Sequence, residues 1–169
     1  APESSCHRCD LAFLAELGAA VLNPACGEQG MGITVGVTSD DELDRALALA
    51  RSYCPDVLIE ERVPGDDLRV VVIDHAVVAA AIRRPADVVG TGRHTVRDLV
   101  EAQSRRRSAA TGGESTIPLD DETARTVDAA GRSLDDVLAE GERLAVRRTA
   151  NLHTGGTIHD VTAELHPEL

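Results

Sequence analysis

The sequence predicts an α+β fold, because short apolar runs typical of strands alternate with helical patterns and turn-forming residues. Two observations dominate the first half: a glycine-rich segment at residues 27–32 between two apolar runs, and a long helical pattern after it. A third, two apolar runs joined by Asp74-His75, predicts a β-hairpin further along the chain. Together they indicate a mixed fold rather than a helical bundle or an all-β protein.

Helices are expected where apolar residues recur at helical spacing, and strands where apolar runs are short and end at turn signals. The predicted helices cover residues 10–17, 41–53, 95–107 and 120–131. The predicted strands cover residues 19–22, 33–37, 57–59, 68–73, 76–82 and 144–148.

The ends of several elements carry their own signals. The strand at 19–22 stops at Asn23-Pro24, as a buried strand would. Ser39 or Asp40 can cap the helix at 41–53, and Asp120 is the candidate cap of the helix that follows it. After the loop at 151–156, carboxylates at four-residue spacing (Asp160, Glu164, Glu168) predict a further helix with one acidic face.

Composition excludes several classes of function. Aromatic residues make up 1% of the chain and its formal net charge is -12, so the sequence offers neither the basic stripe nor the stacking faces that nucleic acids require. No apolar run approaches the roughly 20 residues that span a bilayer. We therefore expect no nucleic-acid partner, no membrane partner and a cytoplasmic location, where the cysteines Cys6, Cys9, Cys26 and Cys54 would be free thiols.

The glycine-rich segment is a candidate phosphate-binding element. Glycine lets the backbone approach a phosphate and direct N–H groups at it. The segment does not have Walker or Rossmann spacing, and it joins two strands rather than a strand and a helix. By itself it is more typical of an ordinary flexible hairpin turn.

A second candidate element is the run Glu60-Glu61-Arg62-Val63, with Asp67 four residues further on. The end of a strand can offer backbone groups to an adenine edge, and a carboxylate just beyond it can accept hydrogen bonds from ribose hydroxyls. Taken alone, the run is more typical of a solvated acidic turn.

In combination these elements are more specific. A glycine hairpin, a helix, and a strand that ends in acids before Pro64-Gly65 follow the order of an ATP-grasp nucleotide site. Residues 27–37, 57–92 and 151–161 resemble ATP-grasp peptide ligases of the cyanophycin synthetase type, and residues 150–157 are similar to that group's N-L-x-T-G-G loop.

Residues 103–107 and 109–115 look closer to the ligase module of N-acetylglutaminylglutamine synthetase. The resemblance covers nearly everything from about residue 17 onward and implies a partial ATP-grasp fold. It implies an N-terminal tail at 1–18, a small lobe at 19–63, and an incomplete second lobe at 64–169 with a mobile loop at about 84–118.

The resemblance implies an ADP-forming ligase, in which ATP phosphorylates a carboxylate and an amine attacks the acyl phosphate. The glycine segment would cover the β- and γ-phosphates, the acidic strand end would frame adenine, and Asp67 would hold ribose. The implied nucleotide contacts are Asn23, Gly27, Glu28, Gln29, Gly30, Gly32, Glu60, Glu61, Arg62, Val63, Asp67, Gly155 and Gly156. The implied catalytic residues are Arg83, Arg84, Asn151 and His153, although the two arginines also suit a solvated strand end and His153 an exposed surface.

Two departures from the family bear on activity. The family has lysine in a V-K-P pattern before the glycine loop, whereas this chain has Asn23, and it contains no lysine at all. Asparagine can bond a phosphate but cannot neutralise its charge. The family's magnesium ligands lie downstream, so we expect them outside these residues, expect a fragment of a longer ligase, and do not expect this chain alone to be competent.

Three hypotheses remain at the level of sequence: a ligase module acting on an amino acid or dipeptide, a non-catalytic nucleotide-binding remnant, and a fragment with no function of its own. Cys6 and Cys9 have the spacing of half a zinc site, but no second pair follows, so no metal site is predicted there. The run at 105–107 is typical of a solvated helix face, and in the family context it would attract an acidic substrate.

Overall fold

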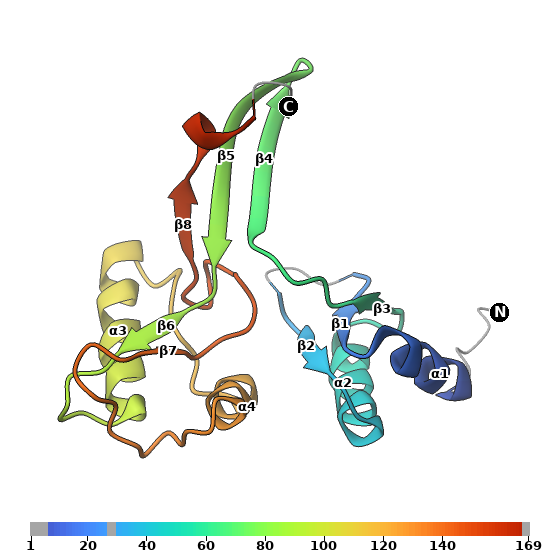
Figure 1. The fold of residues 1–169 in the computed structure, drawn as a ribbon, viewed down its shortest axis with the longest axis horizontal. Coiled ribbons are helices and arrows are strands. Elements are labelled where there is room, and N and C mark those ends of the chain that lie inside the picture. Colours follow the sequence, from blue (N-terminus) through green and yellow to red (C-terminus); the bar gives the residue numbers. More distant parts are fainter. Residues whose placement is uncertain (1–6, 27–29, 167–169) are drawn as a thin grey trace. The chain divides into compact units, whose positions relative to one another are not determined.

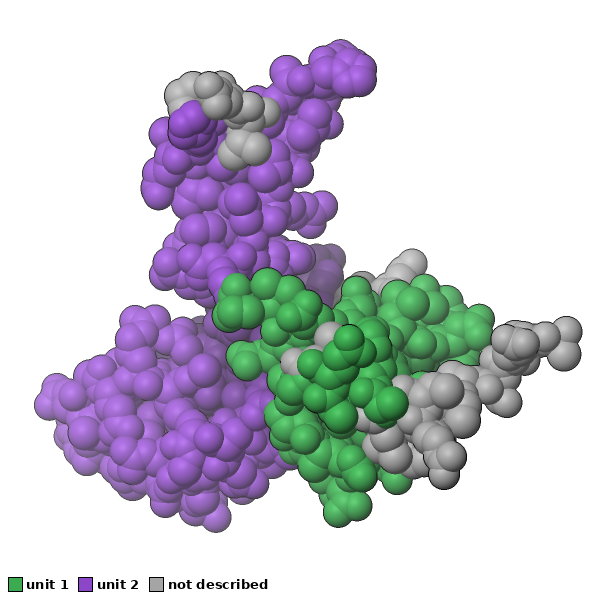
Figure 2. Space-filling model, turned by 45° about the vertical axis from the view of Figure 1, so that its right-hand side comes forward, with its two compact units in different colours: residues 1–64 green, residues 65–169 purple. Residues whose placement is uncertain are grey.

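The structure, a computed structural model, describes residues 7–26 and 30–166. The chain divides into two compact units, Ala1–Pro64 and Gly65–Leu169 (Figure 2). Each unit has its own hydrophobic core. The α+β class predicted from the sequence is confirmed, since both units combine helices with antiparallel sheets (Figure 1).

The first unit packs two helices against a three-stranded antiparallel sheet of order β2-β1-β3. Its elements are α1 (His7–Leu17), β1 (Ala20–Pro24), β2 (Thr34–Val37), α2 (Asp40–Tyr53) and β3 (Val57–Glu61). The core forms because β1 buries alternate residues and α2 buries residues at helical spacing. The buried members are Leu14, Ala20, Leu22, Val37, Leu43, Ala46 and Leu47.

Ser39 caps α2 as expected, with its side chain accepting a hydrogen bond from the Glu42 N–H. β1 is longer than predicted, because it includes Asn23 and Pro24. The Ala25 N–H donates to Asp56 O, so Ala25 and Asp56 form a hydrogen-bonded pair of the ladder between β1 and β3. Bonded and non-bonded pairs alternate in an antiparallel ladder, so the backbone nitrogen of Pro24 points away from β3. On the other side, pairing with β2 ends at Leu22, so the missing N–H of proline interrupts no ladder bond.

The second unit contains a long hairpin, β4 (Asp67–Ile73) and β5 (Ala76–Arg84), with β8 (Thr157–Asp160) on the other edge of β5. Asp74 and His75 have positive φ angles of 50° and 64°, which two-residue hairpin turns require, so the predicted hairpin is confirmed. A second group packs β6 (Asp87–Val89) and β7 (Arg143–Ala145) with α3 (Val96–Thr111) and α4 (Asp121–Ala129) (Figure 1). Its core consists of Ala86, Val88, Val96, Val100, Ile117, Val127, Leu138, Leu144 and Val146.

The helix predicted at 95–107 is confirmed as the 16-residue α3, and strand β6 precedes it in the segment 84–118 without having been predicted. Two expectations were wrong. The strand expected at 144–148 is β7 and ends at Ala145, because the next two N–H groups both donate to the carbonyl of Ala86. The helix expected after the 151–156 loop is instead strand β8, followed by one 3-10 turn, Thr162–Glu164.

Pairing with β5 explains that last difference, because β8 continues the sheet and the Val161 N–H then donates to the carbonyl of Ala80. Asp160 accepts bonds from the Thr162 N–H and hydroxyl, and these bonds lower the pKa of its carboxyl. Glu168, the last residue of the expected acidic face, lies outside the described residues.

The cysteines also differ from expectation. Cys26 and Cys54 form a disulfide, although they were expected to be free thiols. The pairing could not be predicted from the sequence, because the two cysteines are separated by 28 positions along the chain. Cys6 lies outside the described residues. Over the part of the chain that is described, none of the helices has the length and apolar character needed to cross a bilayer.

Candidate functional site

In the second unit, one end of the β4-β5-β8 sheet brings together most of the predicted catalytic residues. Asp67, the first residue of β4, lies opposite Arg83 on β5. Arg84 lies opposite Thr157, the first residue of β8. The 151–156 loop leads directly into Thr157. Segments far apart in the sequence therefore place two arginines beside this loop.

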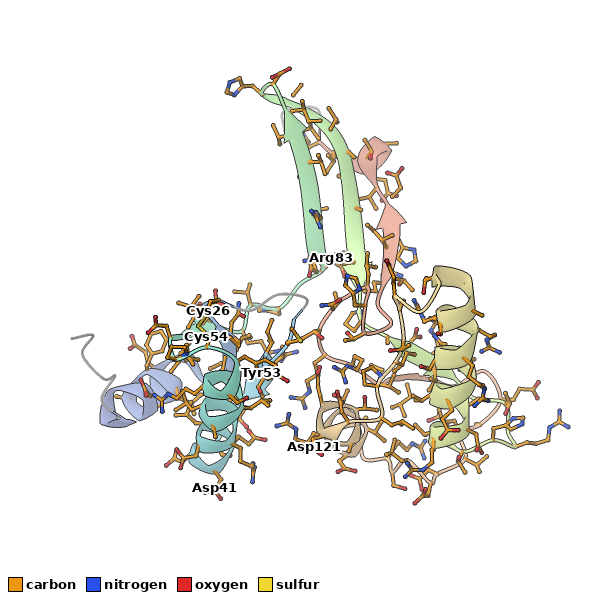
Figure 3. The ribbon with its side chains drawn as sticks, turned by 180° about the vertical axis from the view of Figure 1, so that it is seen from behind. Cys26, Asp41, Tyr53, Cys54, Arg83 and Asp121 are labelled. Carbon is orange, nitrogen blue, oxygen red and sulfur yellow. A yellow bond between two sulfur atoms is a disulfide. The ribbon has the colours of Figure 1, made fainter. Side chains whose placement is uncertain are left out.

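Arg83 and Asp67 form a bidentate ion pair at this end of the sheet. Arg83 Nε lies 3.0 Å from Asp67 Oδ1, and Arg83 Nη2 lies 2.9 Å from each carboxylate oxygen. Their side chains are 34% and 40% exposed, so the pair faces solvent in part. Figure 3 labels Arg83 at this end of the long hairpin. The sequence assigned Asp67 to ribose and Arg83 to phosphate or acyl phosphate, but it did not predict that they bind one another.

The 151–156 loop is tightly packed at its glycines. Gly155 and Gly156 are both buried, and the Gly156 N–H donates to Asn151 O over 2.7 Å. A Cβ on Gly155 would lie 2.4 Å from Ile117 Cγ1, and one on Gly156 would lie 2.7 Å from Asn151 O and 3.0 Å from Arg84 O. These glycines are needed for the close approach of the loop to β5 and to the core.

His153 and Asn151 shape the exposed side of the same loop. His153 is exposed; its backbone N–H donates to Asn151 Oδ1, and its Nδ1 lies 3.0 Å from Glu114 O. The imidazole is thus tied to the chain that follows α3. Of its two ring nitrogens, Nε2 is the one that this contact leaves for a ligand.

Arg107 and Ser115 donate hydrogen bonds to backbone carbonyls of the 151–156 loop, and reasoning from sequence missed both. Arg107 is partly buried and its Nη1 donates to Gly156 O over 3.2 Å, while Ser115 Oγ donates to Leu152 O over 2.6 Å. The run at 105–107 was interpreted as a solvated face, which fits Arg105, an exposed partner of Glu101, but not Arg107. Helical periodicity contained the signal, because position 107 follows the buried Val100 by seven residues.

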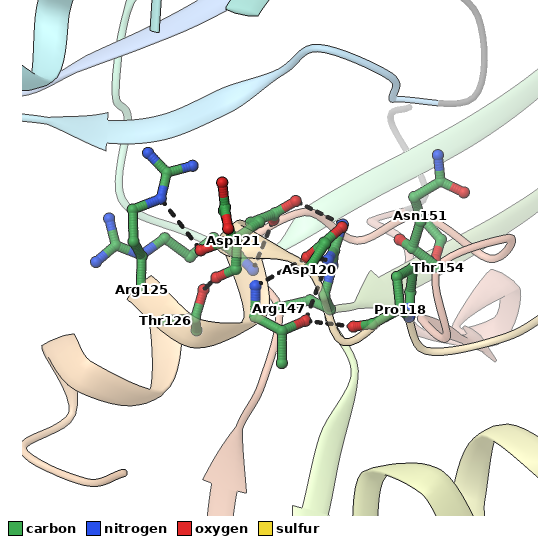
Figure 4. A network of polar contacts seen from close by, with 11 residues as sticks. Pro118, Asp120, Asp121, Arg125, Thr126, Arg147, Asn151 and Thr154 are labelled. Carbon is green, nitrogen blue, oxygen red and sulfur yellow. Dashed lines mark hydrogen bonds and ion pairs between the residues drawn. The ribbon is translucent and has the colours of Figure 1, made fainter. Parts of the chain in front are cut away.

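A third missed residue, Arg147, anchors the chain that precedes the loop to α4 (Figure 4). It is 5% exposed; its Nη1 lies 2.5 Å from Asp120 Oδ1 and its Nη2 2.6 Å from Glu122 Oε2. Burial alone would raise the pKa of Asp120, but the hydrogen bonds from Arg147 and Thr123 lower it overall. The Asp120 carboxylate is therefore held ionised where it also caps α4.

In the first unit, two predicted nucleotide contacts share the sheet face that the helices do not cover. Asn23 lies opposite Leu58 and Val21 lies opposite Glu60, so Asn23 and Glu60 are diagonal neighbours on the same face, at about 7–8 Å. Leu22 and Ala20 point the other way, into the core. On this face Glu60 is exposed, whereas Asn23 is partly buried.

The other predicted nucleotide contacts are only partly described. Glu61, Arg62 and Val63 are exposed at the end of β3 and beyond it. Gly32 has a φ of +75°, and a Cβ there would lie 2.6 Å from Tyr53 Cδ2 and 2.8 Å from Pro24 Cγ. Gly30 is partly buried, and Gly27, Glu28 and Gln29 lie outside the described residues.

Comparison with known proteins shows which class combines these features. No family model matches the chain. It is 38% identical over 151 residues to cyanophycin synthetase from Nostoc sp., covering 88% of this chain and 17% of that protein. It is 33% identical over 147 residues to the glutathione biosynthesis bifunctional protein GshAB from Streptococcus thermophilus, covering 84% of this chain and 20% of that protein.

The fold agrees with these relatives. The crystal structure of a bifunctional glutathione synthetase from Pasteurella multocida matches with a TM-score of 0.50 and 27% identity, over 96% of this chain and 23% of that one. The chain is thus an ATP-grasp ligase segment with a partial ATP-grasp fold. Within that class, the chain is 38% identical to the cyanophycin synthetase relative and 33% identical to the GshAB relative. It spans about a fifth of the length of the curated relatives that it matches.

Proposed function

We propose that this chain is part of an ADP-forming carboxylate–amine ligase that activates an acid as its acyl phosphate. The observation that carries the proposal is the convergence of Arg83, Arg84 and the 151–156 loop at one end of the β4-β5-β8 sheet. Phosphoryl transfer spreads negative charge over the oxygens of the transferred group, so cationic side chains held in place favour it. Arg84 is exposed there, which suits it to an anionic ligand.

The nucleotide would bind along the sheet of the first unit. Residues 60–63 are at the end of β3, where exposed backbone can frame adenine, and the family resemblance assigns the ribose to Asp67. Asn23 would meet the phosphates from the open face of β1. Asparagine donates a hydrogen bond there but adds no positive charge, which predicts weaker ATP binding than a lysine would provide.

Magnesium is a cofactor of this class of chemistry, and its ligands are proposed to come from outside this chain. Among the described residues, no group of three or more His, Cys, Asp or Glu side chains is placed to hold a metal ion. The steps that we propose for the chain's own residues are binding and orientation. Arg83, whose guanidinium is fixed by its ion pair with Asp67, and Arg84 would position the acyl phosphate beside the 151–156 loop.

The acid and the amine are proposed to be an amino acid and a dipeptide or second amino acid. Residues 103–107 and 109–115 favour a substrate of the N-acetylglutaminylglutamine synthetase kind, with a cyanophycin synthetase-like amino-acid ligase as the alternative. We place the enzyme in the cytoplasm, where ATP is supplied.

A coupled ADP-release assay on the ligase that contains this segment tests the proposal. With magnesium, ATP and candidate amino-acid or dipeptide substrates, ADP formation should depend on the acceptor. Arg84→Ala should abolish it, whereas Arg105→Ala, which removes an exposed arginine from the outer side of α3, should leave it unchanged. Equal activity of the two variants would refute the role of Arg84. The isolated chain should bind ATP without releasing ADP.

One observation favours a different function, a nucleotide-binding remnant without catalysis. Asn23 stands where the family has its lysine, and the chain has no lysine to replace it. That hypothesis predicts saturable ATP binding by calorimetry with no acceptor-dependent ADP from the full ligase. Acceptor-dependent ADP formation by the same protein would exclude it.

A further inference from the structure

The Cys26–Cys54 disulfide ties the end of β1 to the end of α2. Cys26 follows the last residue of β1 by two positions and is exposed, whereas Cys54 is the C-cap of α2 and is 2% exposed. Figure 3 shows the two cysteines beside Tyr53. The bond therefore joins a surface position to the edge of the core.

Each cysteine of the disulfide lies within two residues of a side chain that packs against Gly32, the last glycine of the 27–32 segment. A Cβ on Gly32 would lie 2.6 Å from Tyr53 Cδ2 and 2.8 Å from Pro24 Cγ. Tyr53 immediately precedes Cys54, and Pro24 precedes Cys26 by two residues. The bond therefore fixes the two surfaces between which Gly32 is held.

We propose that Cys26–Cys54 is a reversible redox site whose reduction loosens the packing of Gly32 between Tyr53 and Pro24 and weakens nucleotide binding. The second half of this inference rests on the proposed function, because it requires the glycine segment to contact nucleotide. The first half stands on the contacts of Gly32 alone. A cytoplasmic reductant would then lower the enzyme's affinity for ATP, and oxidising conditions would raise it.

The chemistry needs a dithiol reductant. One of its thiolates attacks the exposed Cys26 Sγ, the S–S bond breaks, and the Cys54 sulfur leaves as a thiolate that takes up a proton. The second thiol of the reductant then attacks the mixed disulfide and releases Cys26. Two electrons and two protons pass to the protein, and the reductant leaves as a disulfide. Exposure of Cys26 and burial of Cys54 determine which sulfur is attacked.

Neighbouring contacts keep the effect local. The Cys54 N–H donates to Ala50 O, which holds the end of α2 without the disulfide, and the Ala25 N–H donates to Asp56 O, which holds the chain up to Ala25. Reduction thus frees Cys26 from the end of α2 while the sheet persists. Because the freed side chains must be ordered again on binding, ATP affinity should fall about two- to tenfold.

The test compares oxidised and dithiothreitol-reduced forms of a Cys6→Ser/Cys9→Ser chain, which leaves only the pair in question. Alkylation and mass spectrometry should find no reactive thiol before reduction and two after it, and oxidised glutathione should restore the first state. Amide hydrogen exchange of residues 30–33 should be faster in the reduced form, and calorimetry should show the weaker ATP binding. A Cys26→Ser/Cys54→Ser chain should behave as the reduced form under both conditions.

The outcomes separate the two ideas. The redox site would be overturned if Cys26 and Cys54 reacted with the alkylating agent in the air-oxidised chain. It would also be overturned if the rate of amide hydrogen exchange at residues 30–33 were the same in the oxidised and reduced forms. Redox-dependent exchange with equal ATP affinity in both states would overturn the link to nucleotide. If neither state binds ATP while exchange still responds to reduction, the proposed function fails and the loosening of Gly32 stands.

Discussion

Substituting Gly155 by alanine tests whether the 151–156 loop is held by close packing. Gly155 has a φ of +94°, which favours glycine, and its Cβ position lies 2.4 Å from Ile117 Cγ1 and 3.1 Å from Ala86 Cβ. Ile117 is only 3% exposed and belongs to the core, so it has little room to move. The variant should combine backbone strain with overpacking.

The chain contains controls that separate these two costs. Gly113 has nearly the same φ, +97°, with nothing within 4 Å of its Cβ position, so Gly113→Ala measures strain alone. Such strain costs about 1–3 kcal/mol. Gly156→Ala measures crowding, since its Cβ would lie 2.7 Å from a backbone oxygen, and overpacking costs about 1–3 kcal/mol. Gly155→Ala should thus lose about 2–6 kcal/mol, more than either control.

Urea titration followed by far-UV circular dichroism would measure these losses. The chain has no tryptophan, and its single tyrosine, Tyr53, belongs to the first unit, so intrinsic fluorescence would not report on the second. In a thermal scan, each kcal/mol corresponds to about 4–8 °C for a domain of 60–100 residues. Equal destabilisation by Gly155→Ala and Gly113→Ala would show that Ile117 yields freely and that the packing argument is wrong.

Three further predictions concern charge. Asn23→Lys should tighten ATP binding by on the order of 1.5–3 kcal/mol in calorimetry, because an ammonium joins the phosphates; an affinity equal to that of Asn23→Gln would show that position 23 does not face them. The pKa of Asp98 is lowered by the Thr95 hydroxyl and then by the Thr95 N–H, so Asp98→Asn should reduce stability above the ordinary value of 3.8, and the gap should close as pH falls below it; a pH-independent gap in urea titrations would contradict this. Arg147→Ala should lose about 3–5 kcal/mol by leaving the Glu122 carboxylate, 18% exposed, without its partner, whereas Arg147→Met combined with Glu122→Gln should recover part of it.

Features encoded over a few residues could be predicted from the sequence. The N-caps Ser39 and Asp120, the buried face of α2 and the hairpin at Asp74-His75 all depend on side chains within one turn or one strand of each other. Their signals are periodicity and capping, which a window of about a dozen residues contains. The resemblance to ATP-grasp ligases likewise depends on contiguous motifs, and the comparisons confirm it.

Features that depend on distant pairing could not be predicted in this way. β8 forms because β5 offers it an edge, and this tertiary pairing overrides the helical spacing of the acids around Asp160. The inward turn of Arg107 depends on a carbonyl 49 residues away, and the partners of Arg147 lie on α4. Arg107, interpreted from the sequence as part of a solvated face, and Arg147, placed in a predicted strand, thus become anchors of the candidate catalytic loop.

The pairing of Arg83 with Asp67 changes how the site is understood. Residues assigned separately to ribose and to phosphate form one bidentate unit across adjacent strands, with β4 and β5 setting their register. An arginine held in this way presents its guanidinium in a fixed plane, so little side-chain entropy is lost when an anion binds. Asp67 therefore positions Arg83, and the proposed ribose contact would be a second role for the same carboxylate, with the register of the β4–β5 hairpin fixing where that carboxylate lies.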